Sequence, residues 1–179
     1  MSSELKIAIS GKSGCGNTTV SRLLAERLSL RLINYTFHDM ARERGISFEE
    51  LCRRAEEDNQ YDLYLDRHQV ELASQESCVL ASRLAIWLLK EAQLKVYLYA
   101  SPEVRAGRIA GRENQPLDQA LEELRDRDDR DHQRYLRLYG IDIDDYRFAD
   151  LIVDTETLNA EQVVDSIVEV LGCGANSVG

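Results

Sequence analysis

Leu5–Thr19 reads LKIAISGKSGCGNTT, and its residue pattern is the strongest indication of fold in the chain. Its first part, Leu5–Ser10, is short and rich in branched residues, which is typical of a buried strand. Glycines follow directly. From Asn17 onward, apolar residues recur at the three- and four-residue spacing of an amphipathic helix, namely Val20, Leu23, Leu24 and Leu28. The stretch predicts a strand, a glycine loop and a helix, in that order.

The glycine loop matches the phosphate-binding pattern G-x-x-x-x-G-K-[ST], except that Asn17 stands where the pattern has lysine. Glycines let successive backbone N–H groups turn inward around a phosphate, and the N-terminus of the helix adds a positive dipole. We expect the Thr18 hydroxyl to bind Mg²⁺. The residues predicted to hold the phosphates are Gly11, Lys12, Ser13, Gly14, Cys15, Gly16, Asn17, Thr18 and Thr19.

Asn17 can hydrogen-bond a phosphate oxygen, but it carries no charge and cannot neutralise a transferring phosphoryl group. Another cation must do so. The chain has 22 basic residues, of which four are lysines and the other 18 are arginines, whose planar fork binds phosphate bidentately. We favour the arginines over Lys12, because the sequence does not tell which way Lys12 points in the loop.

Composition limits the class of protein. A chain of 179 residues with 44% hydrophobic content fits one globular domain. The net charge of -10 argues against polymeric nucleic acid and anionic lipid as partners. No apolar run approaches the roughly 18 residues that a membrane span needs. The four cysteines form no C-x-x-C pair and no secretory signal precedes them, so we expect reduced thiols in the cytoplasm. We also expect the protein to be a monomer.

Four further strands are predicted, each separated from the next by helical pattern. This alternation is typical of an α/β fold with three layers, in which helices cover both faces of a five-stranded parallel sheet. A polar helical stretch, 36–75, interrupts the fold as an insertion that could move over a site. The tail 172–179 is expected to be disordered. The further strands are Leu30–Tyr35, Cys78–Ser82, Leu94–Ala100 and Leu151–Asp154.

Arginines follow these elements in two places. Arg83 comes just after the third strand, at the strand end where open α/β sheets bind ligands. Arg105, Arg108 and Arg112 recur at helical spacing, which suits a lid that closes on phosphates, or alternatively a helix face paired with nearby glutamates.

A third group lies further on. Arg127, Asp131 and Arg134 share one helix face and could hold a phosphate and a sugar hydroxyl, although a solvated, charge-paired helix explains them too. The three histidines have no metal-ligand spacing, and no Ser-His-Asp order is present, so zinc and hydrolase chemistry lack support.

Taken together, these motifs resemble those of the short, archaeal-type cytidylate kinases, which are small P-loop nucleoside monophosphate kinases. The resemblance covers nearly the full chain. It implies one P-loop kinase domain, 1–179, with a core of 1–35 and 76–175, a nucleoside-monophosphate-binding insertion at about 36–75 and a lid at about 107–116. Besides the loop, it rests on VLASRLAIW at Val79–Trp87, SPEVRAGRIAGRE at Ser101–Glu113, and Arg134-Tyr135 followed by YGID at Tyr139–Asp142.

The resemblance implies Mg²⁺-dependent transfer of the γ-phosphoryl group of ATP to CMP or dCMP. The phosphate loop would bind ATP, and a lid near Arg108 to Arg112 would close on it. Our candidates for the catalytic cations are Arg108, Arg112 and Lys12. Contacts to the monophosphate substrate would come from Arg83, Arg127, Asp131 and Arg134. The chain departs from the family twice, with Asn17 in place of a lysine or threonine and Ala81-Ser82 where Glu-Gly is common.

Two alternatives stay open from the sequence. The first is a P-loop kinase of another small acceptor, such as AMP or shikimate, because the loop says nothing about the acceptor. The second is a nucleotide-binding regulator that has lost catalysis, since Asn17 and Ala81 depart from the pattern. The carboxylate that would orient magnesium is also open, with Asp39 and Asp150 as candidates.

Overall fold

The computed structural model describes residues 4–175 and contains one five-stranded sheet with the order β2-β3-β1-β4-β5. All neighbouring strands run parallel, as predicted. The second strand is shorter than expected, because the chain leaves the sheet after Ile33. The strands are β1 (Lys6–Gly11), β2 (Arg31–Ile33), β3 (Cys78–Ala81), β4 (Leu94–Tyr99) and β5 (Leu151–Asp154).

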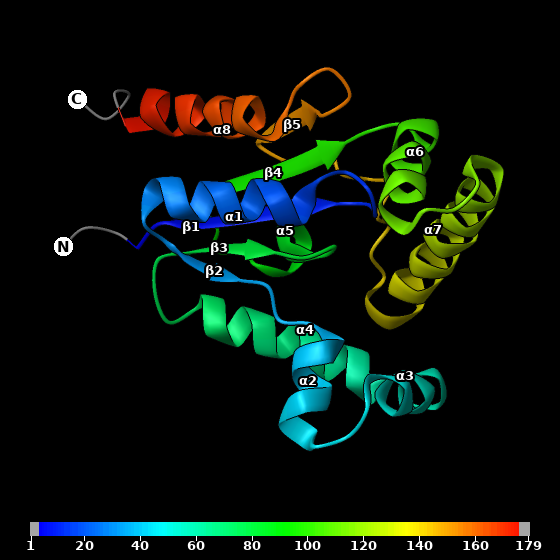
Figure 1. Cartoon of the computed structure of the whole chain (residues 1–179). Coiled ribbons are helices and arrows are strands. Elements are labelled where there is room, and N and C mark those ends of the chain that lie inside the picture. Colours follow the sequence, from blue (N-terminus) through cyan, green and yellow to red (C-terminus); the bar gives the residue numbers. More distant parts are fainter. Residues whose placement is uncertain (1–3, 176–179) are drawn as a thin grey trace.

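Helices cover both faces of the sheet, which gives the predicted three layers (Figure 1). On one face, α1 (Asn17–Leu28) and α8 (Ala160–Ala175) bury Leu24 and Ile167 against Ile7 and Val96. On the other face, α5 (Ala85–Leu88) and the end of α4 (Gln60–Ala73) pack on Ala8, Leu80 and Tyr97. Because α8 runs to Ala175, the tail predicted to be disordered begins as helix, and 176–179 lie outside the described residues.

The segment between β2 and β3 is helical, as expected, and forms α2 (Phe37–Arg44), α3 (Phe48–Glu57) and α4. Figure 1 shows these three helices beneath the β2 edge of the sheet. Side chains cap the first two, since Thr36 and Asp39 form a capping box and the Ser47 hydroxyl accepts from the Glu50 amide. The insertion has its own small core around Met40 and Leu51.

The helices α6 (Pro102–Glu113) and α7 (Leu117–Tyr139) pack against each other through Ala106, Ile109 and Leu124. They lie beyond the carboxyl ends of the strands in Figure 1. The Ser101 side chain caps α6, and Pro102 takes its first position. The region expected to be a lid, 107–116, consists of the end of α6 and the link to α7. Within residues 4–175, no helix combines the length and the apolarity needed to cross a bilayer.

Candidate active site

The phosphate loop joins β1 to α1 through two glycines in the left-handed backbone region, Gly14 with φ of 84° and Gly16 with φ of 88°. Gly14 also lies directly against α6. A Cβ atom at this position would come within 2.9 Å of both the Cβ and the carbonyl oxygen of Arg105. The position therefore requires glycine for its backbone angle and for its close approach to α6.

A cavity of about 560 Å³ lies in front of this loop. All the predicted phosphate-binding residues line it except Cys15, whose side chain is buried in the apolar core. The Cys15 backbone still shapes the loop, because its amide donates to the Lys12 carbonyl at 3.2 Å. The other walls come from the strand ends, the insertion and α7, so the cavity joins the two parts of the chain that the sequence predicts to bind separate ligands.

Four of the predicted arginines line the cavity, namely Arg83, Arg112, Arg127 and Arg134. Arg83 donates to the Ser13 hydroxyl at 2.6 Å, which fixes its guanidinium against the phosphate loop. Burial, together with the charges of Arg127 and Arg134, lowers the pKa of Arg83 from its ordinary value. Such crowding of cations is favourable when a phosphate dianion binds between them.

Asp131 does not belong to the cavity lining, although the sequence places it on the same helix face as Arg127 and Arg134. Its side chain is buried, forms an ion pair with Arg83, and accepts from Arg134 Nη2 at 3.2 Å. Asp131 lies behind the two guanidiniums and holds them in place. The expected contact of Asp131 with a sugar hydroxyl stays a prediction, and the structure shows its carboxylate paired with Arg83 and Arg134.

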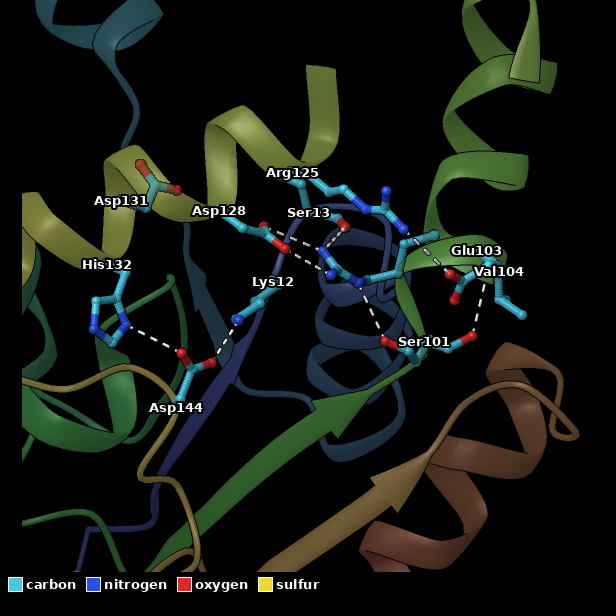
Figure 2. A network of polar contacts seen from close by, with 12 residues as sticks. Lys12, Ser13, Ser101, Glu103, Val104, Arg125, Asp128, Asp131, His132 and Asp144 are labelled. Atoms are coloured by element: carbon cyan, nitrogen blue, oxygen red, sulfur yellow. Dashed lines mark hydrogen bonds and ion pairs between the residues drawn. The ribbon is translucent and has the colours of Figure 1, made fainter. Parts of the chain in front are cut away.

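Arg105, Arg108 and Arg112, which the sequence groups as candidate lid residues, lie in three different surroundings. Arg105 is buried, with two bonds to Asp128 at 2.7 and 3.2 Å and one to the Ser13 carbonyl at 3.2 Å. Figure 2 shows Ser13 and Asp128 in this network. Three residues along α6, Arg108 donates to the Gly14 carbonyl at 3.0 Å and to Thr155. Only Arg112 faces the cavity.

Lys12 lines the cavity, but its ammonium group pairs with Asp144 at 2.5 Å. Figure 2 shows Asp144 between Lys12 and His132, whose Nδ1 lies 3.1 Å from the carboxylate. Lys12 lowers the pKa of the Asp144 carboxyl against the opposing effect of burial. Contrary to the spacing argument, the fold also brings Asp142 close to His132, with the three ligand atoms within 4.8 Å of one another. Of the two carboxylates in this group, Lys12 pairs with that of Asp144.

The candidate magnesium ligands differ in whether they line the cavity. Thr18 is exposed and lines the cavity, and Ser82 offers a second hydroxyl there. Asp39 instead caps α2, and Asp150 accepts from the Lys95 amide at 2.8 Å, so both carboxylates have structural partners. A hydroxyl donor set fits a magnesium ion that keeps most of its waters and is bound chiefly through substrate phosphates.

The insertion contributes cavity residues that our sequence interpretation missed. Apolar and aromatic side chains such as Phe37 and Leu65 form one part of this wall, and Asp62, Asp66 and Gln69 form another. The spacing of 62, 65, 66 and 69 on α4 is that of one helix face, so periodicity could have revealed the wall. It did not stand out, because nothing in the sequence says which face of an isolated insertion helix turns toward the loop.

Solved structures with a similar fold show the class of protein to which the chain belongs. The chain has the P-loop kinase fold, since it matches the shikimate kinase from Acinetobacter baumannii in complex with shikimate with a TM-score of 0.65. That alignment covers 99% of this chain and 97% of the other at 21% sequence identity. The family follows from sequence, because residues 6–157 match the model of the cytidylate kinase-like family. The chain belongs to this family and is a nucleoside monophosphate kinase.

Curated relatives agree with this assignment. Cytidylate kinase 2 of Borrelia garinii subsp. bavariensis is 49% identical over 167 residues, covering 91% of this chain and 94% of the relative. The cytidylate kinase of Archaeoglobus fulgidus is 40% identical over 170 residues, covering 93% and 94% respectively. The similarity to bacterial and archaeal enzymes confirms the resemblance seen in the motifs.

Proposed function

We propose that this protein transfers the γ-phosphoryl group of ATP to CMP, and also to dCMP. One observation carries the proposal: a single cavity places the phosphate loop opposite Arg83, Arg127 and Arg134, with the insertion closing its far end. Two phosphorylated ligands can therefore meet with their phosphates between these cations. The names of the relatives support cytidine as the nucleoside.

In this proposal the backbone amides of the phosphate loop, including that of Lys12, bind the ATP phosphates. Arg83, Arg127 and Arg134 bind the acceptor phosphate. The reaction is in-line, with an acceptor phosphate oxygen forming the new P–O bond as the bond to ADP breaks. Arg112 stabilises the charge spread over the transferred group. Thr18 would hold a magnesium ion, which when bound neutralises phosphate charge. Movement of the insertion and of 107–116 would exclude water from the site.

Arg108 has a different place in this proposal from the one expected. Its guanidinium binds the carbonyl of Gly14 and both oxygens of Thr155. It thereby links the phosphate loop to the segment that follows β5. Arg108 supports the donor side of the site, while the charge on the transferred group falls to Arg112.

A coupled assay of ADP release with CMP, AMP, UMP and no acceptor, all at equal concentrations, tests the proposed function. We expect turnover with CMP to exceed that with the other acceptors in kcat/KM. Preference for AMP would retain the kinase class and reject cytidine. ATP binding with no product from any acceptor would favour the regulator that has lost catalysis.

Arg112→Ala should lower kcat by roughly tenfold to a hundredfold while changing the KM for ATP little, because a charge used mainly in the transition state affects rate more than binding. Arg112 is available for this role because it lines the cavity and because its ion pair, with Glu113 at 3.4 Å, is exposed to solvent. Steady-state kinetics with varied ATP measures both constants. Arg125→Ala, an exposed arginine of α7 outside the lining, is the matched control. An unchanged kcat in Arg112→Ala would remove this residue from the chemistry.

A further inference from the structure

One face of α4 closes the end of the cavity farthest along the insertion. Asp62, Asp66 and Gln69 from this face belong to the lining, beside Phe37 and Leu65. Gln69 is committed to the fold, because its amide donates to the Tyr35 carbonyl at 2.6 Å. The carboxylates of Asp62 and Asp66 are therefore the groups on this helix that can accept a hydrogen bond from the polar edge of a nucleobase lying along the apolar wall.

The two carboxylates differ in what already binds them. Asp62 pairs with Arg134 at 3.3 Å, so its charge is compensated from α7. Asp66 accepts from the Tyr139 hydroxyl at 2.5 Å through Oδ2 only. Its Oδ1 receives no hydrogen bond from the part of the chain that the structure describes. Asp66 lines the cavity with a carboxylate that Tyr139 orients through one oxygen, so the other oxygen can still accept a hydrogen bond.

We propose that Asp66 is the specificity-determining residue for the base, accepting a hydrogen bond from the exocyclic amine of cytosine. This inference rests on the proposed function. Uracil carries a carbonyl oxygen where cytosine has that amine, so two acceptors would face each other and the pyrimidine would be rejected. Asp66 is half-buried, and a ligand that covers the acceptor without donating to it leaves it unpaired, which is why such a site discriminates strongly.

The protonation of Asp66 gives this inference a distinctive signature. The charged and titratable groups that face it are Asp62 on its own helix, and Arg134 and Tyr139 on α7. Burial dominates over them and raises the pKa of Asp66 to about 6. Above this pH the carboxylate only accepts, whereas below it the protonated group can also donate to the uracil carbonyl. Discrimination between CMP and UMP should therefore be full above pH 7 and weaken as the pH falls through 6.

The test is the ratio of kcat/KM for CMP to that for UMP, measured from pH 5 to pH 8 in the wild type and in Asp66→Asn. The two nucleotides carry the same phosphate, so its titration cancels in the ratio. The wild-type ratio should fall toward acid pH. In Asp66→Asn the ratio should be at least about tenfold lower at pH 8 and should not vary with pH, because the amide both donates and accepts.

Two further variants separate specificity from folding. Asp62→Asn makes the same chemical change one turn away and should shift the rates for CMP and UMP together, leaving the ratio unchanged. Tyr139→Phe keeps the Asp66 carboxyl but removes a hydrogen bond that favours its ionised form. The pH at which the CMP-to-UMP ratio falls by half should therefore be higher in Tyr139→Phe than in the wild type. A purely structural role for Asp66 predicts no such movement.

Each outcome is decisive. A wild type that prefers CMP, with an Asp66→Asn variant of the same ratio and the same pH profile, overturns this inference and leaves the proposed function intact. A wild type that phosphorylates no cytidine nucleotide overturns the proposed function and this inference with it. Loss of the pH dependence in Asp66→Asn, together with a lowered ratio, supports Asp66 as the residue that selects the base.

Discussion

Arg83→Ala should lower kcat/KM for CMP by about 10²–10³-fold, the loss expected when a preorganised donor to a reacting phosphate is removed. Arg83 follows β3 and lines the cavity, and both ends of its guanidinium are bound, one by the Ser13 hydroxyl and the other by Asp131. This double attachment orients the fork before the acceptor arrives. Steady-state kinetics with varied CMP measures the loss.

Two controls accompany this prediction. Arg83→Lys keeps the charge but cannot bind Ser13, Asp131 and a phosphate at once, so its activity should fall between those of the wild type and Arg83→Ala. Arg22→Ala removes an exposed arginine of α1 that pairs with Glu26 outside the cavity, and should leave kcat/KM unchanged. If Arg83→Ala loses no more activity than Arg22→Ala, Arg83 does not bind the acceptor.

Arg105→Ala should lower the free energy of unfolding by about 3–5 kcal/mol, because it breaks a buried ion pair and leaves the Asp128 carboxylate without its cation. Arg105 is 3% exposed and donates to Asp128, to the Ala100 carbonyl and to the Ser13 carbonyl. It ties the start of α6 to both α7 and the phosphate loop. Urea unfolding followed by circular dichroism, with the midpoint and slope compared, measures the change.

The surface arginine Arg27 is the matched control for this stability effect. It makes two ion pairs, with Glu161 and Asp165, but all three side chains are exposed to solvent. Arg27→Ala should therefore destabilise the fold far less than Arg105→Ala. The double variant Arg105→Ala/Asp128→Ala should lose less than the sum of the two single changes, because it removes both charges together. An Arg105→Ala variant as stable as Arg27→Ala would contradict this account.

The sequence predicted the sheet and the phosphate loop well, because both depend on local pattern. Alternating strands and helices restrict the topology, and Gly14 and Gly16 adopt the left-handed backbone angles that the loop requires. The strand after α7, Leu151–Asp154, has the predicted bounds. These features need no knowledge of distant contacts.

The roles of the arginines could not be predicted in the same way. Three arginines of α6 share one helical spacing but differ in their partners. Arg105 is buried and paired with Asp128, Arg108 donates to backbone carbonyls, and Arg112 faces the cavity. Which of them faces the cavity depends on how α6 packs against α7 and the loop. The Asp144 partner of Lys12 is 132 residues away in the chain, so no local pattern could reveal it.

The proposed reaction moves a phosphoryl group from ATP to CMP, and a radioactive label on that group follows the transfer itself. The protein is incubated with Mg²⁺, CMP and ATP labelled with ³²P at the γ-position, and the nucleotides are separated by anion-exchange chromatography. Our account predicts that the label appears in CDP at the rate at which ADP forms. Label that stays on ATP, or that is released as inorganic phosphate without CDP, would contradict it.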